Sequence, residues 1–199
     1  MDQTIVIATG NEHKRAEYAA LLTIPGYRIV SLRDLGIVAD APEDGTTFTE
    51  NALQKARYYA QQSGHITIAD DSGISVAALD GAPGVYSARY GTPDLDDRGR
   101  RLLLLDTVNR LNPVDRAAAF RCVIALVLPG GREFTCVGRC DGLIAHTEEG
   151  AGGFGYDPIF WLSNRGCTMA SLSAEEKNAI SHRGRAVQQL KILMTELLG

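Results

Sequence analysis

The chain has 199 residues, of which 45% are hydrophobic and 22% charged, a balance typical of a globular protein with a packed core. Its formal net charge of −4 argues against broad nucleic-acid binding, which needs a basic face to displace counterions. No apolar run is long enough to span a bilayer and no basic leader precedes an apolar region, so we expect a cytoplasmic protein without membrane or nucleic-acid partners. The length fits a single domain over residues 1–199, or two lobes that share a core.

The chain opens with an apolar segment over residues 4–8, which predicts a buried strand. Thr9, Gly10 and Asn11 follow, and then a predicted helix that carries Lys14 near its start. This order is typical of phosphate binding, because free N–H groups and the positive helix end face the turn. It is not a Walker A loop, since the GxxxxGK[ST] spacing is missing. A structural turn without a ligand is the alternative.

A second strand is predicted over residues 27–31, followed by an acidic loop that contains Glu43. Thr47 and Glu50 have the spacing of a capping box and predict that a helix begins there. Lys55 lies on this helix, which leads toward the next strand. Glu43 and Lys55 are therefore candidates for an active site, although a loop acid and a solvated charge are the simpler interpretations.

Residues 66–69 predict a short buried strand that ends at Asp70, Asp71, Ser72 and Gly73. Two carboxylates and a hydroxyl at a strand end suit magnesium and phosphate chemistry. Neighbouring strand residues point to opposite faces, so Asp70 and Asp71 share one site only if the chain turns there. Gly73 makes such a turn inexpensive. A simple turn that leaves a strand is the alternative.

Residues 81–90 are rich in glycine and proline and predict a rigid turn or the lining of a cleft. Residues 94–109 predict a leucine-rich helix. We expect Arg98, Arg100 and Arg101 on the solvated face of this helix rather than in a nucleic-acid patch.

A β-hairpin is predicted from residues 117–128 and 132–141, with Pro-Gly-Gly at its turn and a short additional strand at 143–145. The four cysteines form no CxxC pair and have no histidine at zinc spacing. Buried thiols are therefore favoured over a disulfide.

Glycines flank Phe154 and predict either a backbone that approaches a ligand closely or a turn with a core aromatic ring. Residues 173–176 form a second capping box, which opens a short helix that carries Lys177. His182 and Arg183 begin the last helix, where cations oppose the helix dipole. An anion or a base edge explains them better than stability does, while an exposed pair is the simpler alternative.

Taken together, these motifs resemble those of the inosine triphosphate pyrophosphatase family, whose members hydrolyse non-standard purine nucleoside triphosphates. The resemblance spans nearly the whole chain in the family's order, and its bacterial dITP/XTP branch is the most similar. Four motifs carry it: residues 9–14, residues 45–52, residues 70–90, and the pair 153–160 and 173–186. It implies an elongated α/β fold, in which helices flank a mixed sheet and a cleft separates two lobes, and it implies a homodimer.

The resemblance also implies roles for individual residues. Asp71 is the expected proton acceptor, and Glu43 and Asp71 are the expected Mg²⁺ ligands. Many bacterial relatives have two adjacent glutamates where this chain has Pro42-Glu43-Asp44, and whether Asp70 or Asp71 ligates the metal stays open. The expected phosphate-binding residues are Thr9, Gly10, Asn11, Glu12, His13, Lys14, Lys55 and Ser72, and the expected base-binding residues are Phe154, Gly155, Tyr156, Asp157, Lys177, His182 and Arg183.

The implied reaction is attack of water on the α-phosphorus of ITP, dITP or XTP, which releases pyrophosphate and a monophosphate. Lys177 and Arg183 offer only hydrogen-bond donors, which suit the O6 acceptor of hypoxanthine and xanthine and disfavour the amino group of adenine. This does not explain how GTP is excluded. Two alternatives remain: a Maf-type pyrophosphatase that acts on methylated or pyrimidine nucleotides, and a nucleotide-sensing module without catalysis.

Overall fold

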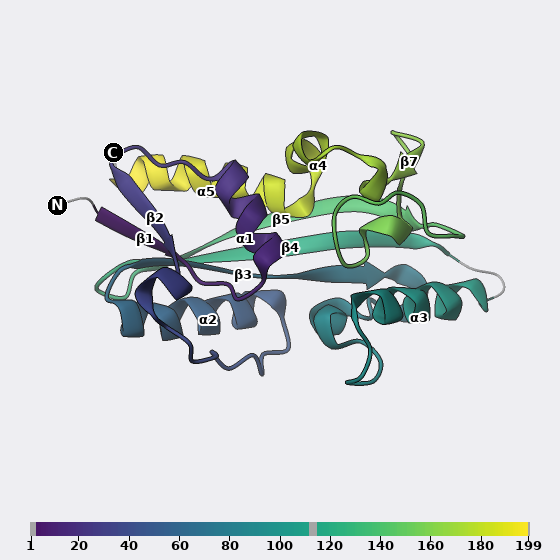
Figure 1. The fold of residues 1–199 in the computed structure, drawn as a ribbon, viewed down its shortest axis with the longest axis horizontal. Helices are drawn as coiled ribbons and strands as arrows, with labels where there is room; N and C mark the ends of the chain where they lie inside the picture. Colours follow the sequence, from purple (N-terminus) through teal and green to yellow (C-terminus); the bar gives the residue numbers. More distant parts are fainter. Residues whose placement is uncertain (1–2, 112–114, 199) are drawn as a thin grey trace. The chain divides into compact units, whose positions relative to one another are not determined.

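The computed structural model describes residues 3–111 and 115–198. Their strands form one seven-stranded sheet in the order β2-β1-β3-β4-β5-β6-β7. β1 pairs in parallel with β2 and β3, whereas β6 pairs antiparallel with β5 and β7, so the sheet is mixed. The strands are β1 (Gln3–Ile7), β2 (Tyr27–Ser31), β3 (Ile66–Val76), β4 (Ala117–Val127), β5 (Glu133–Ile144), β6 (Phe160–Leu162) and β7 (Cys167–Thr168). The helices are α1 (Glu12–Leu21), α2 (Phe48–Ser63), α3 (Asp97–Asn109), α4 (Ala174–Ile180) and α5 (His182–Leu198). The predicted α/β class with a mixed, helix-flanked sheet is confirmed (Figure 1).

The chain divides into two compact units, each built from separate stretches of sequence. Unit 1 comprises the described parts of residues 1–71, 122–138 and 183–199, and unit 2 comprises those of 72–121 and 139–182. The chain therefore passes between the units within β3, β4 and β5 and again at the start of α5. The single domain and the cleft expected from the sequence stay predictions.

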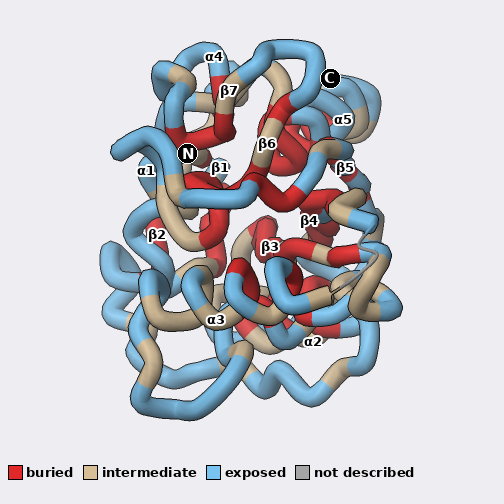
Figure 2. Tube along the Cα trace, turned by 90° about the vertical axis from the view of Figure 1, so that its right-hand side faces the viewer, coloured by how far each residue is buried: buried red, intermediate tan, exposed pale blue. Residues whose placement is uncertain are grey.

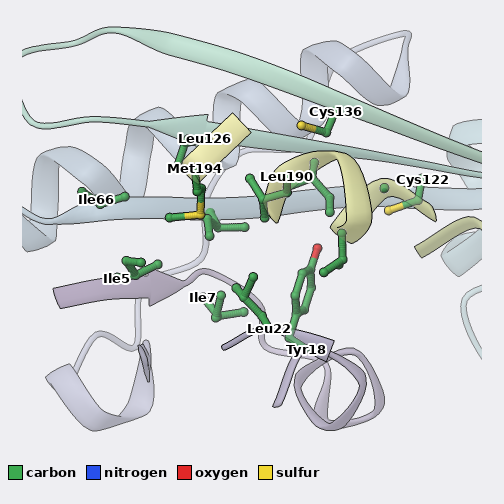
Figure 3. Packing of buried hydrophobic residues seen from close by; sticks show 14 residues of the cluster. Ile5, Ile7, Tyr18, Leu22, Ile66, Cys122, Leu126, Cys136, Leu190 and Met194 are labelled. Carbon is green, nitrogen blue, oxygen red and sulfur yellow. The ribbon is translucent and has the colours of Figure 1, made fainter. Parts of the chain in front are cut away.

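Unit 1 has two apolar layers that follow the alternation of its strands. Odd-numbered residues of β1, such as Ile5 and Ile7, pack with α1 and α5 in a cluster that includes Tyr18 and Leu190 (Figure 3). Val6 packs on the other face with residues of α2. In Figure 1, α2 accordingly lies on one side of β1 and β3, and α1 and α5 lie on the other. Successive side chains of a strand point to opposite faces of the sheet, so odd- and even-numbered residues of β1 face different layers.

Unit 2 has its own core, in which Leu104 and Val108 of α3 pack with Ile74 of β3 and Phe160 of β6. The buried stretches of the chain follow the strands, whereas the connecting segments are mostly exposed (Figure 2). Among the described residues, no helix is both long enough and apolar enough to cross a bilayer.

Local sequence signals located several elements correctly. Thr47 and Ser173 are the N-caps of α2 and α4, and both reciprocal capping boxes are formed. The hairpin is present as β4 and β5, although the strand predicted at 143–145 is the end of β5 rather than a separate element. α3 begins at Asp97, three residues later than predicted, because Asp96 caps it by accepting a hydrogen bond from the Gly99 N–H. The four cysteines are free, as expected.

The prediction of a turn after Asp70 and Asp71 was wrong, because β3 continues through both residues to Val76. Gly73 lies inside this strand and not at a turn. A Cβ at Gly73 would lie 2.5 Å from the Gly84 carbonyl oxygen and would also collide with Ser87 Oγ. The Ser87 hydroxyl accepts a hydrogen bond from the Ile74 N–H (2.9 Å). Glycine is therefore needed here for the close approach of residues 84–89 to the strand, not for a bend.

Candidate active site

The segment between β1 and α1 presents backbone donors at the start of a helix. Asn11 caps α1 by accepting a hydrogen bond from the Lys14 N–H (3.0 Å), and its own N–H donates to Thr9 Oγ1 (3.2 Å). Gly10 is exposed, and a Cβ placed there would meet nothing within 4 Å. Glu12 and His13 are also exposed, and Glu12 forms an ion pair with Arg15. This end of unit 1 is open enough to receive an anion at the helix N-terminus.

Asp70 is the centre of a buried charge cluster in unit 1. Its Oδ2 lies 3.1 Å from Lys14 Nζ and accepts a hydrogen bond from Arg183 Nη2 at 3.1 Å. Arg183 Nη1 donates to Glu17, and the Cys122 thiol is 3.7 Å from Asp70 Oδ2. Burial alone would raise the pKa of the Asp70 carboxyl, but Lys14 and Arg183 hold that pKa well below its ordinary value. Asp70 is thus a permanent anion that fixes two cations.

The same cluster affects its uncharged neighbours. Burial and the Asp70 charge both raise the pKa of the Cys122 thiol, so it remains protonated. Burial and Asp70 also raise the pKa of Tyr18. The Tyr18 hydroxyl and Asp70 Oδ1 are buried without a hydrogen-bond partner in the described part of the chain.

Asp71 belongs to a second cluster in unit 1, which also contains Lys55, Glu43 and Asn51. Asp71 Oδ1 lies 3.5 Å from Lys55 Nζ, and its Oδ2 accepts a hydrogen bond from Asn51 Nδ2 (3.1 Å). Lys55 Nζ also lies 2.8 Å from Glu43 Oε1. Burial would lower the pKa of Lys55, but Asp71, Asp70 and Glu43 raise it above the ordinary value. Lys55 is therefore a buried ammonium that links two carboxylates from different segments.

These two carboxylates are suitable ligands for Mg²⁺. Within residues 3–111 and 115–198, no group of three or more acidic, histidine or cysteine side chains is placed to hold a metal ion. Mg²⁺ does not need such a group, since it is usually held by one or two carboxylates together with substrate phosphates. Glu43 and Asp71 supply only oxygen donors and converge on one cation, Lys55, so the residues fit the metal that the sequence suggested.

Unit 2 contains a third cluster, around a glycine-rich segment that comprises residues 149–158. Asp157 Oδ2 accepts hydrogen bonds from the Phe154 N–H (2.8 Å) and from Lys177 Nζ (2.6 Å). The Lys177 ammonium lies 4.6 Å from the centre of the Phe154 ring. Gly153 has a φ of +67°, and a Cβ there would collide with the Asp157 carboxylate. The glycine thus permits a tight loop in which one acid fixes both an aromatic ring and a cation.

Three further predicted residues, Tyr156, His182 and Ser72, also belong to unit 2. The Tyr156 hydroxyl donates to the Ser87 carbonyl (2.8 Å), and burial raises its pKa. The His182 ring stacks on Phe120, with ring centroids 4.7 Å apart. Ser72 is half-buried in β3, directly after Asp71.

Arg183, which was predicted to bind the base, is a buried residue of unit 1. Its side chain is 1% exposed, and its two terminal nitrogens donate to Glu17 and Asp70 in unit 1. Burial would lower the pKa of Arg183, but Asp70 and Glu17 raise it. Direct contact of Arg183 with a base stays a prediction, whereas its ion pairs with two carboxylates are what the structure shows.

Two residues that orient these groups were not among the predicted site residues. Asn51 is buried one helical turn before Lys55 on α2, and this spacing was a usable signal for a shared face. Glu17 occupies the same face of α1 as Lys14 by an i, i+3 spacing, but only the fold brings Arg183 to it.

Comparisons with known proteins find similar sequences over nearly the whole chain. A sequence model of the Ham1 family matches residues 5–193. A protein of Geobacter sulfurreducens named dITP/XTP pyrophosphatase is 48% identical over 187 residues, which are 94% of each chain. A protein of Photorhabdus laumondii with the same name is 47% identical over 190 residues, which are 94% of this chain and 96% of the relative.

Solved structures are also similar. A HAM1 protein from Coxiella burnetii has a TM-score of 0.90 and 42% identity, with 98% of this chain and 99% of that chain covered. The Ham1 protein of Staphylococcus aureus has a TM-score of 0.88 and 38% identity, with 98% and 100% covered. The family expected from the motifs is therefore confirmed: the match extends over nearly the whole sequence and the whole fold, and the chain belongs to the Ham1 family.

Proposed function

We propose that the protein is a Mg²⁺-dependent nucleoside triphosphate pyrophosphatase that converts ITP, dITP and XTP to the monophosphate and pyrophosphate. One observation carries the proposal: Lys55 lies between Glu43 and Asp71, so two carboxylates and a buried cation meet at one place in unit 1. The dITP/XTP pyrophosphatase name of the relatives supports the same reaction and substrate class. Removal of such nucleotides before polymerases use them is the biological role that follows.

The chemistry assigned to unit 1 is hydrolysis of the α–β phosphoanhydride bond. A water oxygen attacks the α-phosphorus, the bond to the bridging oxygen breaks, and pyrophosphate leaves with the electron pair. Asp71 accepts the proton of the attacking water, and Asn51 holds its carboxylate in place. Lys14, Lys55 and the N–H groups at the start of α1 offset the negative charge of the phosphates. Bound Mg²⁺ would supply charge neutralisation at the phosphates, and Glu43 and Asp71 are the residues that would hold it.

The base is assigned to the cluster in unit 2. The Phe154 ring offers a stacking surface, and stacking of a base on an aromatic ring contributes about 1–3 kcal/mol. Lys177 offers a donor to O6 of hypoxanthine or xanthine, and Asp157 orients that donor. An adenine amino group would leave the donor unpaired, which costs about 1–3 kcal/mol. His182 and Tyr156 complete the proposed group.

A nucleotide panel tests the proposal. The purified protein is incubated with Mg²⁺ and, separately, with ITP, dITP, XTP, GTP, ATP and dTTP, and pyrophosphate is resolved from orthophosphate. We expect pyrophosphate from ITP, dITP and XTP, little turnover of ATP, and loss of activity with EDTA that added Mg²⁺ restores. A preference for dTTP would instead indicate the Maf-type alternative. Unchanged ITP would indicate a binding module, and orthophosphate as first product would contradict attack at the α-phosphorus.

A homodimer and a cytoplasmic location are part of the same proposal. The resemblance to the inosine triphosphate pyrophosphatase family motivates both. Light scattering of the purified protein measures the mass directly, and a mass near 21.4 kDa would contradict the dimer.

A further inference from the structure

Arg101 of α3 contacts both Glu148 and the glycine-rich segment of unit 2, residues 149–158. Arg101 Nε donates to Glu148 Oε1 (2.5 Å), and Arg101 Nη1 donates to the carbonyl oxygen of Gly155 (2.7 Å). The sequence suggested that Arg98, Arg100 and Arg101 are solvated. The side chains of Arg100 and Arg101 are only 15% and 13% exposed, whereas that of Arg98 is 69% exposed. We propose that Arg101 is a positioning residue for the base end of the substrate, an inference that rests on the proposed function.

The segment from 149 to 158 is already closed at its ends without Arg101. The Glu149 N–H donates to the Pro158 carbonyl (2.9 Å), and the Gly152 N–H donates to the Ala170 carbonyl (2.9 Å). A Cβ at Gly150 would lie 2.5 Å from the carbonyl carbon of Ala170, so this side of the loop packs directly on the backbone. These contacts hold the two ends of the loop. The tip of the loop, residues 153–155, depends on other contacts.

The tip is the part that carries Phe154, and it is intrinsically adaptable. Gly153 and Gly155 flank Phe154 and have φ values of +67° and +58°. Glycine has the greatest backbone freedom of any residue, so ordering two of them costs conformational entropy. Two hydrogen bonds fix the tip. The Asp157 carboxylate accepts one from the Phe154 N–H, and Arg101 donates the other to the Gly155 carbonyl.

An arginine suits this position because its guanidinium is a rigid planar fork. Glu148 binds the Nε end of the fork and thereby orients Nη1 toward the Gly155 carbonyl. A neutral side chain at position 101 would lose the charged hydrogen bond and release the tip. The Phe154 ring would then lie where it can stack on the base in fewer molecules, so KM would rise. The chemical step in unit 1 would be unchanged.

Arg101→Gln tests the inference through ligands that carry different parts of the substrate. KM for ITP and the inhibition constant of inosine monophosphate are expected to rise about tenfold, the lower range for loss of a charged hydrogen bond. The inhibition constant of inorganic pyrophosphate, which has no base, is expected to stay within about twofold, as is kcat. Arg101→Lys keeps the charge but has one donor centre, so the same selective rise, of smaller size, is expected.

Arg110→Gln is the matched control, since Arg110 lies just after α3, is 78% exposed and pairs with Asp106. It is expected to behave as the wild type in every assay. An unchanged KM in both Arg101 variants would overturn the inference, and so would an equal loss for pyrophosphate and inosine monophosphate, which indicates a general structural defect. Wild-type protein that leaves ITP intact would overturn the proposed function itself, and the two failures are thus distinguishable.

Discussion

Asp70 and Asp71 are consecutive residues of β3, yet their carboxylates contact different lysines: Asp70 lies 3.1 Å from Lys14 Nζ, and Asp71 lies 3.5 Å from Lys55 Nζ. Asp70 lies two residues after Ile68 and therefore faces the same layer, that of α1 and α5. Asp71 lies two residues after Ala69 and faces the layer of α2. Because β3 continues without a turn, the two adjacent acids have different surroundings: Asp70 is an anion whose Oδ2 pairs with two cations, and Asp71 is a candidate catalytic base.

Asp71→Asn is expected to remove activity and preserve the fold. The amide keeps the shape of the side chain but does not accept a proton from water, so kcat for ITP should fall by about 10²–10⁴-fold. Steady-state kinetics measure the loss, and circular dichroism checks that the secondary structure is unchanged. Full activity in this variant would exclude Asp71 as the base.

Asp70→Asn is expected to act mainly on stability. Removal of this charge leaves Lys14 and Arg183 without the anion between them, and breaking a buried ion pair costs about 3–5 kcal/mol. Denaturant unfolding should therefore show a much lower free energy of unfolding for Asp70→Asn than for Asp71→Asn. Equal stability of the two variants would contradict the different roles assigned to the two acids.

Lys55→Gln is expected to change catalysis and metal binding in opposite directions. Loss of the ammonium removes charge stabilisation, so kcat should fall by about 10²-fold or more. The same change frees Glu43 and Asp71 from a competing cation, so the Mg²⁺ concentration for half-maximal rate should decrease. A Mg²⁺ titration of the residual activity measures this, and a weaker response to Mg²⁺ would show that Lys55 does not compete with the metal.

Gly73→Ala is expected to destabilise unit 2 by about 1–3 kcal/mol, the usual cost of overpacking. The new Cβ would collide with Ser87 Oγ and lie 2.5 Å from the Gly84 carbonyl oxygen. The control is Gly10→Ala, where nothing lies within 4 Å and stability should be unaffected. Thermal melting compares the two, and a melting temperature equal to the wild type for Gly73→Ala would show that residues 84–89 move aside easily.

Glu50→Gln is expected to lower stability at neutral pH only. Hydrogen bonds from the Thr46 N–H and hydroxyl lower the pKa of Glu50, so its charged form stabilises the folded state above its ordinary pKa. This contribution is lost as the pH falls through the lowered folded-state pKa. The melting temperatures of wild type and variant should therefore differ at pH 7 and converge in acid, once the pH lies below the lowered folded-state pKa of Glu50. A difference that persists in acid would assign the effect to shape rather than to charge.

Short-range signals were sufficient for much of the fold. Thr47 with Glu50, and Ser173 with Glu176, specify their helix starts by contacts within four residues, and these predictions were correct. The Pro-Gly-Gly turn likewise located the hairpin of β4 and β5. Residue types and spacing were also enough to indicate the family and to select Lys14, Lys55, Asp71 and Lys177 as candidates.

What the sequence by itself determined was therefore local: helix starts, most strands, and which residues are chemically suited to phosphates, magnesium and a base. Only the tertiary structure decided that β3 continues past Asp71, because strand length depends on pairing with neighbouring strands rather than on local preference. It also decided that Arg183 pairs with Asp70, 113 residues away, and that Arg101 reaches Gly155. Long-range charge pairing leaves no periodic trace along the chain, since burial in the fold, and not spacing, selects the partner.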